Sequence, residues 1–258
     1  PVHRFRIQGG VLKEAYVSLD QDRFVELLDE PSTPLIAQRL ESCGFSPIED
    51  YSGEVNLQIN PWMKSAAEAL DRGFVLTIDY GYDASKLYSP ARTHGTLQTY
   101  YRHVATASPF ESIGMQDITA HVDFSSLMSA GQTVGLIPVG LCTQAQLLYG
   151  LGLSNWIRRL RTENLMQRER DANAMAMREL VRSEGLGQFK ALIQEKNTGV
   201  TKLNHLGISE ALSSESRVLT DWLPIPLLRP DHIPLLEERY PHAGWQWNEE
   251  WTQGIEHT

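Results

Sequence analysis

A helix-forming segment, a glycine and a short apolar run follow one another at residues 61–81, and this order constrains the fold more than any other feature. The segment PWMKSAAEALDRG has Pro61 near its start, strong helix formers in its middle and Gly73 at its end, which predicts a helix. The next residues, FVLTIDYG, are mostly large and apolar with little alternation, which predicts a strand covered on both faces. This order indicates an α/β fold with a largely parallel sheet.

The composition narrows the class of protein. The 258 residues are 41% hydrophobic and 21% charged, as in a folded globular protein. A net charge of −9 argues against nucleic acid as a partner, and it fits either ordinary solubility or a preference for a cationic substrate. No apolar run approaches the roughly eighteen residues of a membrane-spanning helix, so membrane insertion is not expected. The two cysteines fit a reducing, cytoplasmic compartment. Nothing in the sequence specifies an oligomeric state.

Further segments predict the rest of the elements. The segment VHRFRIQGGVLKEAYVSL reads as two strands joined by a tight turn at Gly9 and Gly10, and residues 21–43 read as a helix in two pieces interrupted by prolines. A short β-prone piece leads into a helix that Asp123 or Ser125 caps. Residues 134–141 and the segment GQFKALIQEK are predicted strands, and Thr143 is a predicted helix N-cap.

The C-terminal third divides into a helical region and a tail. Leu153, Trp156, Ile157 and Leu160 share one helical face, and Met166, Met175 and Met177 continue a helical region in which they are expected to fill the core. Residues 197–258 hold four of the six tryptophans: Trp222, Trp245, Trp247 and Trp251. We expect this tail to pack its indoles on the main domain, and docking to a partner is the alternative. The predicted domains are therefore 1–196 and 197–258.

The first candidate site follows the predicted strand at 74–78. Asp79, Tyr80 and Gly81 stand where ligands bind in open α/β sheets, outside the carboxyl end of a strand. Asp79 suits a cationic or hydroxyl-bearing group, and Gly81 allows close approach of the backbone to a ligand. The alternative is that Asp79 only caps the loop. The long segment 82–113, rich in tyrosine, is then a lid or a substrate wall.

The second candidate site is the segment GMQDITAHVDF, residues 114–124. If it is one strand, Asp117, Thr119, His121 and Asp123 share a face, with Gln116 beside them. That arrangement places two carboxylates, a hydroxyl and an imidazole around one cleft, and His121 is suited to act as a general base because its ordinary pKa lies near neutrality. The alternative is that these side chains only satisfy backbone groups at the start of a helix. We expect the two candidate sites to converge at one rim of the sheet.

Other chemistries lack their signatures. His94, His103 and His121 match no compact metal-ligand spacing, and no metal is expected. The sequence has no G-x-S-x-G elbow and no G-x-x-x-x-G-K phosphate loop.

Four motifs in order carry a family resemblance: RGFVLTIDYGY, GTLQTYYRH, IGMQDITAHVDF and GLCTQAQLLYGLGL. The chain resembles the MidA-like family of class I S-adenosylmethionine-dependent methyltransferases, which includes a mitochondrial protein-arginine methyltransferase that assists assembly of respiratory complex I. The resemblance runs from Pro1 to about Lys196 and implies the C-terminal part of a Rossmann-like methyltransferase sheet with helices on both faces. It also implies an N-terminally truncated chain, because the family's glycine-rich cofactor loop lies upstream of the motif that ends in PVHRF.

The resemblance implies that the protein is a bacterial, cytoplasmic enzyme that uses S-adenosyl-L-methionine to methylate an arginine of a protein substrate. Cofactor-binding residues are left unassigned. Asp117, His121 and Asp123 are the predicted catalytic residues, and Asp79, Tyr80, Gly81, Gln116 and Thr119 the predicted substrate-binding residues. The alternative is a methyltransferase-like scaffold or assembly chaperone without activity of its own. The missing glycine-rich loop favours the scaffold for the chain as given, and the dense polar cluster at 114–124 favours the enzyme for the intact protein.

Overall fold

The computed structural model describes residues 1–102, 104–106, 108–201, 203, 222–229 and 231–233. The chain divides into two compact units, residues 1–141 with 192–202 and residues 142–191 with 203–258. This division does not coincide with the predicted domain boundary at 196/197. That boundary stays a prediction, because compact units and family domains are different divisions of a chain.

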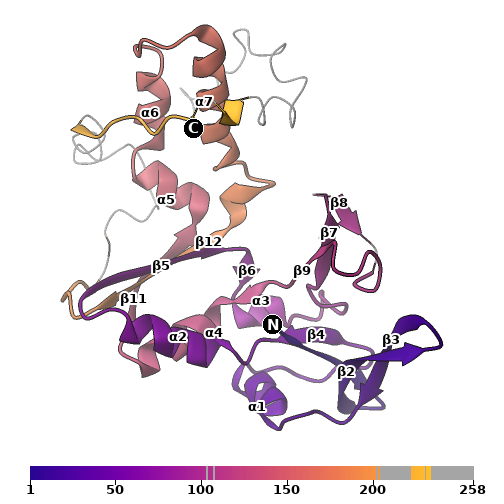
Figure 1. Ribbon diagram of the computed structural model, residues 1–258. Coiled ribbons are helices and arrows are strands. Elements are labelled where there is room, and N and C mark those ends of the chain that lie inside the picture. The colour runs from indigo at the N-terminus through magenta and orange to yellow at the C-terminus, as the bar shows by residue number, and fades with distance from the viewer. Residues whose placement is uncertain (103, 107, 202, 204–221, 230, 234–258) are drawn as a thin grey trace. The chain divides into compact units, whose positions relative to one another are not determined.

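The first unit is a mixed α/β structure (Figure 1). Its elements in chain order are β1 (His3–Gln8), β2 (Val11–Asp20), β3 (Arg23–Asp29), α1 (Leu35–Ser42), β4 (Ser52–Val55), α2 (Ile59–Glu68), β5 (Gly73–Asp79), β6 (Gly81–Tyr82), α3 (Ala84–Leu87), β7 (Gln98–Tyr101), β8 (Val104–Thr106), β9 (Asp117–Thr119), β10 (Val122–Asp123), α4 (Phe124–Thr133) and most of β11 (Ile137–Thr143). The second unit holds α5 (Gln144–Gly150), α6 (Leu153–Arg159), α7 (Gln167–Glu179) and the short 3-10 helix η1 (Leu186–Gln188), and β12 (Lys190–Lys196) leads back to the first.

In the described part of the chain the strands form four sheets. Their orders are β3-β2-β1-β4, β11-β12-β5, β8-β7-β9 and the pair β10-β6. The predicted hairpin at Gly9 and Gly10 is confirmed, with β1 and β2 antiparallel and both glycines at positive φ. The predicted helical piece at the start of 21–43 is wrong, because β3 pairs antiparallel with β2 along its whole length. Pairing with a neighbouring strand outweighs the local helix propensity of RFVELLD.

The first hydrophobic core lies on one face of the N-terminal sheet. Phe5 and Ile7 of β1 pack with Ile36 and Leu40 of α1 and with Tyr51, and all five side chains are buried. Because successive strand residues point to opposite faces, Arg4 and Arg6 project from the other face. The sheet therefore has one buried face and one face that is free to line a site.

The second core holds β5 and β12 against two helices. Met63 and Ala67 of α2 pack with Phe124 and Leu127 of α4 and with Leu192 of β12. Asp123 caps α4, as predicted, by accepting a hydrogen bond from Ser126 N at 3.0 Å. These contacts place α2 and α4 on the same face of the sheet (Figure 1).

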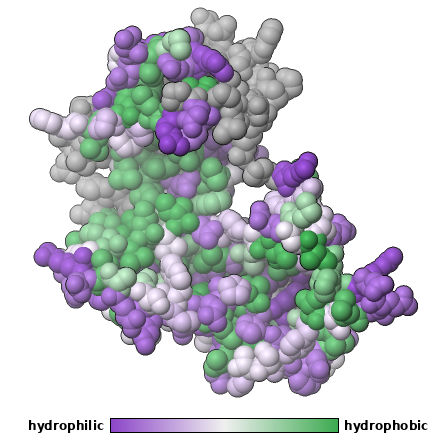
Figure 2. All heavy atoms as spheres, in the orientation of Figure 1, coloured by the Kyte–Doolittle hydropathy of each residue, from purple (hydrophilic) through white to green (hydrophobic). Residues whose placement is uncertain are grey.

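The prediction that the strand at 74–78 is covered on both faces is wrong. β5 alternates, and the side chains of Phe74, Leu76 and Ile78 are 47%, 53% and 41% exposed. Figure 2 shows apolar atoms gathered over this strand. The sequence pattern is that of a two-sided strand, while the described residues cover only the side that carries Val75.

The second unit is built around α6 and α7. Leu153 and Leu160 pack with Met177 and with Ile225, and Thr143 caps α5 with a capping box, as predicted. Met177 is buried, which confirms its predicted place in the core, whereas Met166 is 68% exposed and does not fill the core. Of the tail tryptophans only Trp222 is described, and its indole is exposed rather than packed. The other three lie outside the described residues. Among the described residues of the tail, Ile225 packs in this core and Leu228 N donates a hydrogen bond to Asn173 Oδ1 at 2.6 Å.

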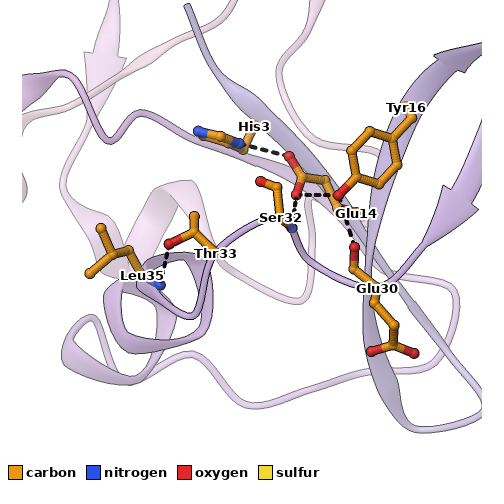
Figure 3. A network of polar contacts seen from close by, with 7 residues as sticks. All are labelled: His3, Glu14, Tyr16, Glu30, Ser32, Thr33 and Leu35. Atoms are coloured by element: carbon orange, nitrogen blue, oxygen red, sulfur yellow. Dashed lines mark hydrogen bonds and ion pairs between the residues drawn. The ribbon is translucent and has the colours of Figure 1, made fainter.

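A buried carboxylate ties the N-terminal sheet to the loop that follows β3 (Figure 3). Glu14 accepts hydrogen bonds from Ser32 N at 2.6 Å and from Tyr16 Oη at 3.0 Å, and its other oxygen lies 2.7 Å from His3 Nδ1. Burial alone raises the pKa of Glu14, but the hydrogen bonds from Ser32, His3 and Tyr16 outweigh it and lower the pKa to about 2. The folded state therefore favours the ionised carboxylate.

Replacement of Glu14 by Gln is expected to destabilise the chain by about 2 kcal/mol at pH 7, since several hydrogen bonds to a charge are lost. The folded pKa lies below the ordinary value of 4.5, so this contribution is complete above about pH 4.5 and fades as the pH falls toward 2. Denaturant unfolding of wild type and Glu14→Gln at pH 7 and pH 3.5 measures it. Glu41→Gln, at an exposed position on α1, is the control. An equal difference between wild type and variant at both pH values would contradict the interpretation.

Candidate active site

A short parallel pair of strands brings the two predicted site segments together. β6 pairs with β10, with Gly81 opposite Val122 and Tyr82 opposite Asp123. Val122 N also donates to the Tyr80 carbonyl at 3.0 Å. The end of the strand at 74–79 and the segment 114–124 therefore meet at one place in the fold. The backbones of the two segments meet, but of their predicted polar side chains only Asp79 and Thr119 line one common groove.

Gly81 is required by that pairing. A Cβ atom at this position would lie 2.2 Å from the Val122 carbonyl oxygen and 2.9 Å from the Phe124 ring. The expected close approach of the backbone at Gly81 is therefore made to β10 of the same chain.

A groove of about 700 Å³ opens beside this junction, within the usual range for a ligand site. Its floor is the free face of the N-terminal sheet, with Arg4, Val17, Phe24 and Glu26. Its opposite wall is apolar and is formed by Pro109, Phe110, Ile113 and Ile118. Asp79, Thr119 and Val122 line it at the junction of the two site segments. The structure thus places Asp79 and Thr119 in one ligand-sized groove.

The carboxylate on the groove floor is paired with two arginines. Glu26 lies 3.4 Å from Arg4 Nε and 3.1 Å from Arg6 Nη2, and Arg6 Nε also donates to Ser52 Oγ at 3.1 Å. Glu26 therefore has little attraction left for a further cation. Asp79 at the junction accepts a hydrogen bond on its Oδ1 from Tyr80 N at 2.8 Å, and among the described residues it forms no salt bridge with a cationic side chain. The negative charge of the groove therefore centres on Asp79.

His121 lies beside the groove in an aromatic setting. Its ring centroid is 5.3 Å from that of Tyr80 and 5.3 Å from that of Tyr82. The Arg92 guanidinium stacks over Tyr82, with its carbon 3.9 Å from the ring centroid. Burial first, and then the charge of Arg92, lower the pKa of His121, while Asp79 acts in the opposite direction. The imidazole is therefore held neutral near pH 7, and within the described residues its buried Nδ1 has no hydrogen-bond partner.

A buried polar chain fixes the backbone before β10. Glu54 of β4 accepts from Thr96 N at 2.7 Å and from Thr96 Oγ1 at 3.0 Å. Thr96 Oγ1 in turn accepts from His121 N at 3.0 Å. Sequence reasoning missed Glu54, Thr96 and Arg92, because nothing in their local patterns links them to residues 25 or more positions away.

The prediction that Asp117, Thr119, His121 and Asp123 share one strand face is wrong. β9 ends at Thr119 and pairs with β7, whereas β10 starts at Val122 and pairs with β6. The change of partner at residues 120 and 121 breaks the alternation. Asp117 is exposed, and Gln116 Oε1 accepts from Thr106 Oγ1 at 2.7 Å while its amide donates to the Ser108 carbonyl. Gln116 thus ties residues Thr106 and Ser108 together, and neither Gln116 nor Asp117 lines the groove.

Asp123 serves the fold at a distance from the groove. Its Oδ1 caps α4, its Oδ2 accepts from Ser126 Oγ, and the Cys43 thiol lies 3.8 Å away. Burial raises the pKa of Cys43, and the neighbouring Asp123 carboxylate acts in the same direction, so the thiol stays protonated. This environment supports a structural carboxylate and an unreactive cysteine.

Several glycines of the first unit serve close packing. A Cβ at Gly53, Gly81, Gly95 or Gly131 would meet protein atoms within 3 Å. Among the described residues, no helix is long and apolar enough to cross a membrane, and no three metal-binding side chains gather in one place.

A mixed α/β fold with a groove at a strand end defines a ligand-binding domain of the α/β class. Residues 1–142 match a family model described as "Putative S-adenosyl-L-methionine-dependent methyltransferase", and the chain belongs to that family.

Two solved structures, both from Burkholderia thailandensis, resemble the chain. An uncharacterized COG1565 superfamily protein is 28% identical with a TM-score of 0.72, covering 84% of this chain and 56% of its own. A COG1565 superfamily member described as a "likely methyl transferase", bound to S-adenosyl-homocysteine, is 26% identical with a TM-score of 0.67, covering 81% of this chain and 51% of its own. The chain thus spans about half the length of both proteins. No curated protein matches it.

Replacement of Gly81 by Ala is expected to separate β6 from β10 and to destabilise the chain by about 3 kcal/mol or more, since a Cβ cannot fit beside Val122 O. Gly114→Ala is the control: it has positive φ but no atom within 4 Å, so its cost is only about 1 kcal/mol of backbone strain. Thermal unfolding measures both, and amide exchange at Val122 reports the pairing directly. Equal costs for the two variants would refute the requirement for glycine.

Proposed function

We propose that the protein containing this chain is an S-adenosyl-L-methionine-dependent methyltransferase that methylates an arginine side chain of a protein substrate. The observation that carries the proposal is the groove in which Asp79 stands at the junction of two strand ends, beside the His121 cluster. Membership of the methyltransferase family supports the reaction, and a relative bound to S-adenosyl-homocysteine supports the donor. The arginine acceptor is supported by the chemistry of the groove and by the resemblance of the sequence motifs.

We extend the proposal to the sheet. The order β11-β12-β5 is read as the C-terminal part of a Rossmann-like methyltransferase sheet, with α2 and α4 on one face. In such a sheet the site lies at the carboxyl ends of the strands. Asp79 is the last residue of β5, which agrees with that position.

Asp79 is the residue proposed to hold the acceptor. A guanidinium is planar and cationic, and a carboxylate binds it through charge-assisted hydrogen bonds. Because Glu26 is already paired with Arg4 and Arg6, Asp79 is the carboxylate to which a cation in the groove is drawn. The apolar wall at 109–118 limits water around the bound side chain, which strengthens that attraction. Asp79 thereby orients the nitrogen that receives the methyl group.

His121 is proposed as a positioning residue. Its side chain contacts Tyr80 and Tyr82 and is not part of the groove lining. A neutral imidazole packed on Tyr80 fixes the residue that follows Asp79, so it orients the carboxylate indirectly. The direct catalytic roles predicted for Asp117, His121 and Asp123 and the binding role of Gln116 remain predictions. The proposal does not use them, because the structure gives Asp117, Asp123 and Gln116 other surroundings.

S-adenosyl-L-methionine, when bound, supplies an electrophilic methyl group. We assign none of the described residues to it. The setting we propose is a bacterial cytoplasm, and the acceptor we propose is a subunit of a respiratory complex of the complex I type, as the family resemblance implies.

Replacement of Asp79 by Asn is expected to lower methyl transfer to a protein acceptor by about 30-fold or more, since a charge-assisted grip becomes a neutral one. Asp71→Asn is the matched control: the same change on an exposed carboxylate outside the groove is expected to stay within about twofold. The measurement is transfer of a labelled methyl group by the protein containing this chain. Melting temperatures confirm that both variants fold.

Two outcomes oppose the proposal. Wild-type rates in Asp79→Asn would remove Asp79 from the site. Absence of methyl transfer by the wild-type protein, together with retained binding of a partner, would favour the non-catalytic scaffold or assembly chaperone.

A further inference from the structure

The groove lies between the free face of the four-stranded sheet and the edge strand of a second sheet. β3 is an edge strand of the four-stranded sheet, and it contributes Phe24 and Glu26 to the floor. β9 is an edge strand of the three-stranded sheet β8-β7-β9 in the described part of the chain, and it contributes Ile118 and Thr119 to the wall. Edge strands carry backbone N–H and C=O groups that can pair with another extended chain.

Large apolar side chains are open to solvent on both sides of the groove. Val17 and Phe24 stand on the hairpin of β2 and β3, and Ile113 and Ile118 stand on the opposite wall. All four are exposed. Figure 2 shows apolar atoms on this hairpin behind its hydrophilic tip. Exposed apolar groups that gather in one concave site indicate a surface for binding.

Asp79 is the charged side chain of the groove that no salt bridge pairs among the described residues. Among the described residues that line it, the charged ones are Arg4, Glu26 and Asp79, and the first two form an ion pair. Asp79 stands at the junction with β10, while the apolar side chains of the hairpin and the wall extend away from it. The complementary ligand therefore has one cation and apolar groups beside it.

We propose that this groove binds the methyl-acceptor protein as an extended segment, in which apolar side chains flank the cationic residue that reaches Asp79. The extended backbone pairs with the edge of β9, and its apolar side chains contact Phe24 and Ile118. This inference rests on the proposed function for the identity of the cation. The groove thereby sets which sequences around an arginine are accepted.

The test measures binding of a fluorescein-labelled peptide, GVTVRVTVG, to the 258-residue chain by fluorescence anisotropy. Replacement of its valines by serine is expected to weaken binding about tenfold or more, and replacement of its arginine by glutamine about fivefold. Backbone N-methylation at alternate residues is expected to abolish binding in one register and spare it in the other, as in strand addition.

Matched variants of the chain locate the site. Phe24→Ser and Ile118→Ser are expected to weaken binding about tenfold each. Leu27→Ser on the same strand and Met115→Ser near the same wall are the controls, since both side chains are exposed but do not line the groove. Unchanged circular dichroism and melting temperature show that the variants fold.

Each outcome is decisive. Binding that ignores Phe24 and Ile118, or that tolerates N-methylation in both registers, overturns the proposal. So does sedimentation showing a dimer of the chain that Phe24→Ser dissociates, because a second copy then occupies the groove. Binding with the expected sensitivities but without methyl transfer refutes the proposed function and leaves the peptide groove standing. Methyl transfer that is unaffected by Phe24→Ser and Ile118→Ser refutes the peptide groove and leaves the proposed function standing.

Discussion

The parallel contact between β6 and β10 is the interaction on which the site depends. It is only two residues long, and it joins a strand end to a segment about forty positions later. Gly81 makes it possible, since the carbonyl of Val122 occupies the space that any side chain needs. Without this contact Asp79 has no groove beside it, and Tyr80 loses its position against His121. The site therefore depends on the absence of a side chain at Gly81 as well as on its polar side chains.

The buried carboxylates of the first unit divide into structural and chemical groups. Glu14 accepts hydrogen bonds from Ser32 and Tyr16, Glu54 accepts two from Thr96, and Asp123 caps a helix. A carboxylate that accepts such hydrogen bonds stabilises the fold. Glu26 is neutralised by two arginines. Asp79 lines the groove as Glu26 does, but among the described residues no salt bridge pairs it with a cation.

The sequence predicted correctly those elements that depend on residues close together in the chain. The hairpin at Gly9 and Gly10, the caps at Asp123 and Thr143, and the strand ending at Asp79 follow from turn chemistry, capping and apolar runs. β3 was missed because RFVELLD has no β alternation and becomes a strand only through pairing with β2. The shared face at 117–123 failed because β9 and β10 pair with different strands, a nonlocal choice. The floor of the groove could not be predicted, since it brings Arg4 and Glu26 to within reach of residues far along the chain.

The open face of β5 has a practical consequence for handling this chain. The exposed face of this strand carries a row of apolar side chains, Phe74, Leu76 and Ile78. Molecules in a concentrated sample can therefore self-associate through this face. Precipitation and dye uptake in such samples would then reflect this row and reveal nothing about the integrity of the groove. A polar substitution at Leu76 changes sample behaviour while leaving the packing of Val75 against the helices in place.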